Sequence, residues 1–133
     1  MRTIKFRGRS CGFWAHGNLH ICKHDEYGDS AYIIGCTQNP SSTTIVDINT
    51  IGQDTGLHDS IGRAIYEGDI VRYSLDDRKD IGYIAFHAQS ASFRVIAEHT
   101  DFGIGNRGKL HELNLEVIGN IHDNPELLKW KRL

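Results

Sequence analysis

Short segments in which apolar and polar residues alternate, separated by glycines, constrain the fold of this chain more than any other feature. Residues 4–7 are an example, because Ile4 and Phe6 would face one side of a strand while Lys5 and Arg7 face the other. The chain holds 14 glycines and only 2 prolines. Glycine without proline suits tight turns, bulges and hairpins. The pattern therefore predicts a mainly β protein.

The alternating segments can be placed along the chain. Strands are predicted over residues 3–7, 13–15, 19–23, 31–35, 43–48, 70–74, 81–87, 92–97 and 115–121. The segments 81–87 and 92–97 form a predicted hairpin across residues 88–91. Polar or glycine-rich stretches predict a loop over 36–42, a turn-rich connector over 52–62 and a charged loop over 76–80.

One helix start stands out near the C-terminus. Asn124 is a good N-cap, Pro125 suits the first helical position, and Glu126 complements the helix dipole. These residues predict a short helix from Pro125 to about Trp130.

Together the elements favour a mainly β fold: a small, bent sheet or a partly open SH3-like barrel with one short C-terminal helix. An α+β arrangement with an additional helix near residues 105–114 is the alternative. With 133 residues, we expect one domain, with an N-terminal β part over about 1–50 and a barrel-like part over about 55–133. Alternation and β-branching predict its core: Ile4, Phe6, Ile70, Val71, Ile84, Phe86, Phe93, Val95, Val117, Ile118 and Ile121.

Charge and cysteine content limit the function classes. The 15 Lys and Arg against 17 Asp and Glu give a net charge of −2, which argues against a histone-like binder that depends on net positive charge. No apolar run approaches the ~20 residues that span a bilayer, and residues 1–7 lack the apolar stretch of a signal peptide. Three cysteines are too few for a secreted disulfide framework. We expect an intracellular, reducing compartment and no membrane partner.

Cysteines and histidines gather in the first part of the chain, at Cys11, His16, His20, Cys22, His24 and Cys36. Thiolate and imidazole are the ligands that zinc prefers, and His20, Cys22 and His24 would share one strand face. However, no CxxC pair occurs and the spacing matches no zinc finger. The pattern favours an exposed polar strand face, with Cys11 and Cys36 as small buried residues, over a metal site.

Other motifs of catalysis or cofactor binding have better structural interpretations. Residues 103–108 spell GxGxxG, but too little chain follows for the βαβ unit in which such glycines bind a dinucleotide. No GxSxG nucleophile motif occurs, and a cysteine–histidine dyad is defined by spatial adjacency. The acidic stretch 76–80 includes Arg78 and Lys79, which is typical of a solvated loop. We expect no enzyme activity, no catalytic residue and no cofactor.

Basic residues concentrate at the two ends of the chain. The candidate nucleic-acid-binding residues are Lys5, Arg7, Arg9, Lys129, Lys131 and Arg132. The first three share one strand face, and if the termini lie close together, as they often do, all six form one patch able to hold phosphates. Trp14, Tyr32 and Tyr73 can add stacking surfaces for single strands. Protection of a sheet edge and complementation of a helix dipole are the alternatives.

Three blocks of sequence stand out as a set: Ile4 to Gly8, residues 55–71 (TGLHDSIGRAIYEGDIV) and Glu116 to Leu128 (EVIGNIHDNPELL). They resemble the YopX family of phage and prophage proteins, over nearly the whole chain. The resemblance implies a phage or prophage origin and a site of action in the host cytoplasm. The family has no established enzymatic activity, cofactor or catalytic residue set, so it supplies no functional residue.

Turn and capping chemistry accounts for the shared blocks. Gly68-Asp69 suits a tight turn that leads into a strand, residues 117–121 suit a buried strand, and Asn124 starts the helix. We therefore expect a single YopX-like domain that acts as a non-enzymatic binding or assembly module. Its expected partner is a host or phage protein, with a homo-oligomer included. Nucleic-acid binding through the basic residues is the alternative function.

Overall fold

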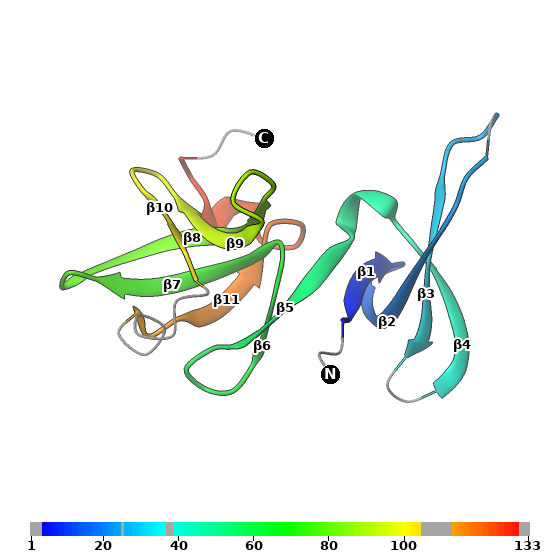
Figure 1. The fold of residues 1–133 in the computed structure, drawn as a ribbon, viewed down its shortest axis with the longest axis horizontal. Coiled ribbons are helices and arrows are strands. Elements are labelled where there is room, and N and C mark those ends of the chain that lie inside the picture. The colour runs from blue at the N-terminus through cyan, green and yellow to red at the C-terminus, as the bar shows by residue number, and fades with distance from the viewer. Residues whose placement is uncertain (1–3, 25, 37–38, 105–112, 131–133) are drawn as a thin grey trace. The chain divides into compact units, whose positions relative to one another are not determined.

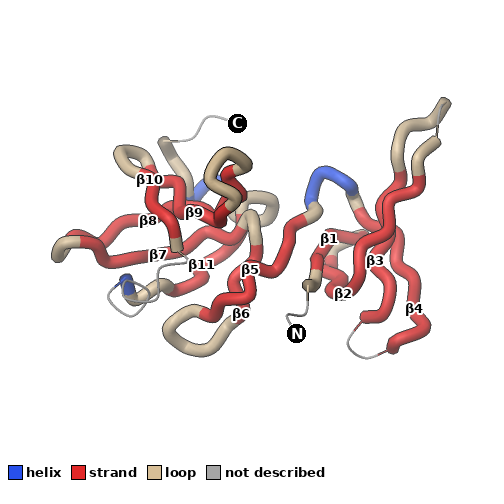
Figure 2. The backbone as a smooth tube through the Cα atoms, viewed as in Figure 1, coloured by secondary structure: helices blue, strands red, loops and turns tan. Residues whose placement is uncertain are grey.

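The structure is a computed structural model that describes residues 4–24, 26–36, 39–104 and 113–130. The chain divides into two compact units, Met1–Gly56 and Leu57–Leu133. Antiparallel strands make up most of the described residues (Figures 1 and 2). Two short 3-10 turns lie wholly within the described ranges, η1 (Ile48–Thr50) and η2 (Pro125–Leu127), and Leu113 is a further described residue in helical conformation. The predicted mainly β fold is confirmed.

The first sheet has the strand order β4-β3-β2-β1-β5-β6. Its strands are β1 (Phe6–Ser10), β2 (Phe13–Cys22), β3 (Ser30–Cys36), β4 (Asn39–Val46), β5 (Gly52–His58) and β6 (Ala64–Tyr66). β5 crosses the boundary between the units, and β6 belongs to the second unit. One face of β1–β4 forms the core of the first unit, whose buried residues are Ala15, Ala31, Ile33 and Val46.

The first sheet curls so that the end of β4 approaches β1, and this approach requires glycine at position 8. A Cβ at Gly8 would lie 2.6 Å from a methyl carbon of Val46. Beside this contact, the Asp47 backbone N–H donates to the Arg9 carbonyl at 2.9 Å. The Arg9 backbone N–H donates in turn to the Thr50 hydroxyl at 2.9 Å. The connection through η1 therefore hydrogen-bonds the part of β1 that lies beyond its pairing with β5.

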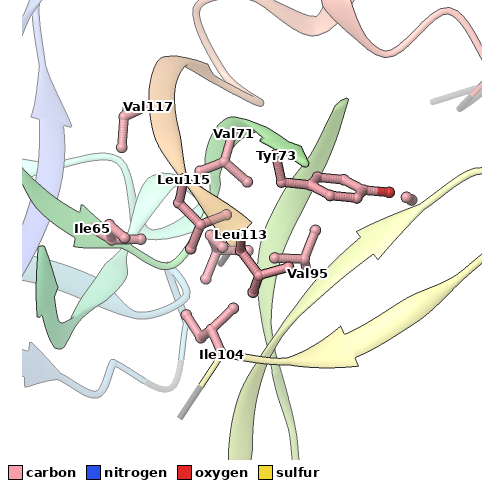
Figure 3. Close-up of a cluster of buried hydrophobic side chains, with 10 residues drawn as sticks. Ile65, Val71, Tyr73, Val95, Ile104, Leu113, Leu115 and Val117 are labelled. Carbon is pink, nitrogen blue, oxygen red and sulfur yellow. The ribbon is translucent and has the colours of Figure 1, made fainter. Parts of the chain in front are cut away.

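The second sheet, in the second unit, has the order β10-β9-β8-β7-β11. Its strands are β7 (Asp69–Leu75), β8 (Arg78–His87), β9 (Ser92–Ala97), β10 (Asp101–Gly103) and β11 (Glu116–Asn120). The predicted hairpin across residues 88–91 is confirmed, with His87 paired to Ser92. The core of this unit, shown in part in Figure 3, consists of Ile65, Val71, Tyr73, Ile84, Val95, Ala97, Ile104, Leu113, Leu115 and Val117.

Two buried aspartates fasten the segments around β6. Asp59 accepts three backbone hydrogen bonds: Oδ1 from the N–H groups of Ile61 (3.1 Å) and Arg63 (2.8 Å), and Oδ2 from Val117 N–H (3.0 Å). Asp69 Oδ2 accepts from Tyr66 N–H at 2.7 Å. Gly68, between Tyr66 and Asp69, has a φ of +92°, which confirms the predicted glycine–aspartate turn.

The predicted C-terminal helix is wrong in extent and in its cap. A single 3-10 turn, η2, stands where a helix to Trp130 was expected. The Asn124 side chain does not cap that turn; its Oδ1 accepts instead from the Asn120 backbone N–H of β11, at 3.2 Å. The side chain that was expected to cap a helix therefore accepts from a donor four residues earlier in the chain.

Three predicted loops are partly strands. β3 extends to Cys36 and β4 begins at Asn39, within the expected loop 36–42; residues 37–38 lie outside the described ranges. β5 occupies most of the expected connector 52–62. Only Asp76 and Asp77 turn the chain between β7 and β8, both with positive φ (51° and 63°). Pairing with a neighbouring strand outweighs polar composition at these positions.

The predicted core is right at strand centres and wrong at two strand ends. Ile70, Val71, Ile84 and Val95 are fully buried. Ile4 is 46% exposed and Phe86 is 48% exposed, because the first precedes β1 and the second lies next to the end of its hairpin. Neither sheet closes into a barrel over the described residues, so the open form of the expected architecture applies. The alternative helix near 105–114 falls almost wholly on residues outside the described ranges.

Candidate binding surfaces of the first unit

The face of β1–β4 opposite the core carries polar, basic and aromatic side chains. In the register of β1 with β2, Arg7 lies opposite His16 and Arg9 lies opposite Trp14. Farther along β2, His20 lies opposite Tyr32 of β3. Side chains alternate along a strand, so these residues share the side of the sheet that does not contain the buried cluster. We call this side the outer face, with Lys5, Arg7, Arg9, Trp14, His20 and Tyr32 as its main side chains.

An arginine and a tryptophan lie in direct contact on the outer face. The Arg7 guanidinium carbon lies 4.7 Å from the centroid of the Trp14 ring, within cation–π range. Arg7 is buried, whereas Lys5 is exposed, and Arg9 and Trp14 are half-buried. Arg7 thus lies against the indole, and Lys5, which directly precedes β1, is the most exposed of the three basic residues.

The pKa of His16 reflects the burial and the charges around this part of the sheet. Burial lowers the pKa of His16 below its ordinary value of 6.5, and the positive charges of Arg7 and Lys5 lower it further. The Asp54 carboxylate opposes this shift. His16 is therefore neutral at pH 7, and the formal positive charge of the outer face comes from lysine and arginine.

Acidic side chains are absent from four consecutive strands. The 5, 10, 7 and 8 residues of β1, β2, β3 and β4 include no Asp or Glu. In the chain as a whole Asp and Glu outnumber Lys and Arg, 17 against 15. The described acids of the first unit thus lie in the connections between strands and in β5, where Asp54 Oδ1 accepts from Gly56 N–H at 2.8 Å. The net charge of −2 for the whole chain therefore does not indicate that this face is locally basic.

A second candidate surface is the edge strand β4, which ends the first sheet beside β3. Its sequence, NPSSTTIV, contains no charged residue. Thr43 and Ile45 are exposed, Ile45 by 58%, and Ile45 lies opposite Tyr32 in the ladder with β3. Natural edge strands are commonly protected by lysine, proline or bulges. Here Pro40 stands at one end and the rest of the strand is β-branched or polar.

The predicted strand over residues 43–48 is present as part of β4, but its position at the edge of the sheet was not predicted. The run of uncharged, β-branched residues from Thr43 to Val46 was the available signal. Edge position itself depends on the strand order of the whole sheet, which the local pattern does not contain.

The predicted nucleic-acid residues are distributed over both units. Lys5, Arg7 and Arg9 belong to the first unit, where they share the outer face. Lys129 is exposed in the second unit, and Lys131 and Arg132 lie outside the described residues. One patch made from both termini stays a prediction. Because η2 spans only three residues, complementation of a helix dipole does not explain Lys129.

Of the three aromatic residues expected to stack on bases, two lie on the outer face. Trp14 and Tyr32 are half-buried there. Tyr73 is 3% exposed and packs edge-on against Phe102 in the core of the second unit, with ring centroids 4.9 Å apart. Tyr73 therefore serves the core, and a stacking role for it is wrong.

The cysteines and histidines do not gather as metal ligands in the part of the chain that the structure describes, where no group of three His, Cys, Asp or Glu forms such a cluster. β2 ends at Cys22, so His24 lies beyond the strand whose face it was expected to share. Cys11 is exposed at a positive φ of 42° in the turn between β1 and β2, contrary to its expected burial.

The GxGxxG stretch lies largely outside the described residues, since only Gly103 and Ile104 are included. A search of the described helices finds none long and apolar enough to cross a membrane.

Comparisons with known proteins place the chain in a family. The family model described as YopX protein matches residues 5–129. No curated protein matches the chain. Among solved structures, the crystal structure of protein EF1440 from Enterococcus faecalis is similar, with 25% sequence identity and a TM-score of 0.51. The similarity covers 96% of this chain and 99% of that one.

Proposed function

Because this chain belongs to the YopX family, we propose that it is a phage or prophage accessory protein that acts by binding, without catalysis, in the host cytoplasm. The binding mode we propose is strand pairing at β4, with a second copy of the chain as the partner. The observation that carries the proposal is the uncharged edge of the first sheet.

The composition of β4 favours pairing. A strand added to a sheet edge gains backbone hydrogen bonds whatever its sequence, while side chains on alternate positions supply selectivity. Lysine or glutamate on that edge would oppose a second strand, and β4 has neither. The exposed Ile45 side chain would bury apolar surface against the added strand or its neighbour.

A second copy is the simplest partner because β4 of each copy offers the same surface. Two β4 strands that pair antiparallel around a twofold axis make a self-complementary interface, which closes after one contact. Because each β4 edge would be covered by the other copy in such a dimer, the uncharged edge would not lead to open-ended assembly.

Sedimentation equilibrium over a wide range of protein concentration tests the proposal. We expect the wild-type chain to dimerise and Ile45→Lys to weaken dimerisation by about tenfold or more, the equivalent of ~1.4 kcal/mol. The added lysine places a charge at an exposed position, so the fold should be retained. Gln89→Lys adds the same charge in an exposed turn of the second unit and serves as the matched control. A wild-type chain that stays monomeric at every concentration would refute association through β4.

A further inference from the structure

We propose that the outer face of the first sheet binds single-stranded nucleic acid, with Lys5 and Arg9 contacting phosphates and Trp14 and Tyr32 stacking on bases. This surface adjoins the β4 edge, since Ile45 lies opposite Tyr32, but the inference does not depend on association through that edge.

Charge complementarity is the first argument. Arg7 and Arg9 lie on one side of the sheet, and alternation places Lys5, which directly precedes β1, on the same side. The four strands that build this side contain no carboxylate to repel phosphate. Asp54 of β5 is an acid beside this side of the sheet: its backbone N–H donates to the Lys5 carbonyl at 2.8 Å, its Oδ1 accepts from the Gly56 N–H at 2.8 Å, and its charge acts on His16. A phosphate chain therefore meets a locally basic surface on a protein whose net charge is −2.

The placement of the aromatic rings is the second argument. Trp14 lies opposite Arg9, and Tyr32 lies opposite His20. Trp14 and His20 are six residues apart on β2, which corresponds to about 20 Å along the strand. The Trp14 and Tyr32 rings are thus spaced along the face, with Arg9 beside Trp14 and His20 beside Tyr32. Basic grooves interleaved with aromatic rings are the usual surface for unpaired strands.

Single strands are favoured over duplexes because much of the affinity would have to come from base stacking and not from phosphate contacts. A few phosphate contacts give weak binding when the whole chain is slightly acidic. Stacking on an aromatic ring adds affinity that does not depend on sequence, but only for bases that are not already stacked within a duplex. Arg7 covers one side of the Trp14 ring at 4.7 Å, so a base would stack on the opposite side.

Tryptophan fluorescence offers a direct test, since the chain has two tryptophans, Trp14 and Trp130, in different units. In the Trp130→Phe variant, Trp14 is the sole indole, and we expect single-stranded oligothymidine or oligouridine to quench its emission. In the Trp14→Phe variant, Trp130 is the sole indole, and its emission should not change. Trp130 stacks on Tyr83 with ring centroids 6.3 Å apart, a contact that phenylalanine can keep.

The salt dependence of binding provides a second readout that does not rely on an aromatic substitution. Each phosphate contact with a single strand contributes a slope of about −0.7 in a plot of log K against log salt. Lys5→Gln, at an exposed position, should make the slope shallower by about 0.7. Lys79→Gln removes the same charge from an exposed position of β8 and should leave the slope unchanged.

The outcomes separate this inference from the proposed function. Binding of the single strands, with Trp14 quenched and the slope changed only by Lys5→Gln, supports the outer face. Absence of binding at low salt, equal affinity for a duplex of the same length, or quenching of Trp130 alone would overturn it. The same titration repeated at protein concentrations below the range in which the chain dimerises reports whether binding survives without association through β4, so either proposal can fail alone.

Discussion

Asp59 is a charged residue that the fold uses as a backbone ligand. Its two carboxylate oxygens accept from three N–H groups, two in the following turn and one in β11, 58 residues later. Burial alone would raise the pKa of this carboxyl; the three backbone hydrogen bonds and the charge of Arg63 outweigh burial and lower the pKa below 3.8. The aspartate in the family-like block 55–71 thus has a structural role.

Asp59→Asn should destabilise the protein by about 1–3 kcal/mol, because an amide has one acceptor oxygen and its NH2 group would face a backbone donor. Urea unfolding gives the free energy of unfolding directly. Asp77→Asn is the matched control: Asp77 is exposed in a turn with positive φ, a conformation that asparagine tolerates. Equal stability of the two variants would show that the Asp59 hydrogen bonds are replaceable.

His16 makes stability depend on pH in a defined direction. Because its pKa in the folded state lies below 6.5, the unfolded chain binds more protons than the folded chain between those two pKa values. The free energy of unfolding contributed by this residue therefore rises with pH through that window and is lost on acidification. We expect His16→Gln to flatten the pH dependence of thermal unfolding around pH 6. An unchanged pH profile would mean that the imidazole is not held neutral by its surroundings.

At the scale of elements, the segment after β11 explains the family-like C-terminal block. Asn120 Oδ1 accepts from the N–H groups of His122 (3.0 Å) and Asp123 (2.9 Å), which forms the turn. Asn124 Oδ1 accepts from the Asn120 backbone N–H. Gly119 leaves room for the Asn124 side chain because it has no Cβ. Leu128, which follows η2, is 1% exposed. The block therefore encodes one folded turn that buries its last leucine.

Gly119→Ala should cost about 1–3 kcal/mol, since its Cβ would lie 2.5 Å from Asn124 Oδ1 and displace that side chain. Gly103→Ala is the control, because the nearest atom to its added Cβ is an Arg94 nitrogen at an ordinary 3.6 Å. In the Asn124→Ala background the Gly119→Ala cost should shrink, which a double-mutant cycle of unfolding free energies measures. Additive costs would contradict the proposed clash.

The sequence predicted correctly those structural features whose signal lies within a few neighbouring residues. Alternation located the hairpin of β8 and β9, and the turn residues Gly68 and Asp69 were correctly interpreted, because these signals act over a few residues. The cap at Asn124 was misassigned because its donor belongs to a strand. β5 was missed because its glycines resemble a connector, although pairing with β1 makes it a strand.

The outer face could be predicted only in part for the same reason. Alternation placed Lys5, Arg7 and Arg9 together, and all three lie in the first unit. The pairing that brings Trp14 beside Arg9, and His20 beside Tyr32, follows from strand register, which no single segment specifies. The burial of Tyr73 likewise depends on the complete second core.

At the scale of the whole molecule, the two units differ in what they offer to a partner. The core of the second unit is extensive, and its two buried aspartates and folded C-terminal turn stabilise it. The first unit has a smaller core, an uncharged edge strand and a basic, aromatic face. Antiparallel pairing of two β4 strands would place both outer faces on the same side of one extended sheet. A nucleic-acid strand could then contact two copies and gain avidity.

The claim that β4 is an association edge is tested most directly by hydrogen exchange of its backbone amides at increasing protein concentration. We expect the amides of residues 43–46 that point away from β3 to become more protected as concentration rises, while those of the exposed turn at 88–91 do not change. Ile45→Lys should abolish this gain. Protection of β4 that is the same at low and high concentration would contradict pairing at this edge.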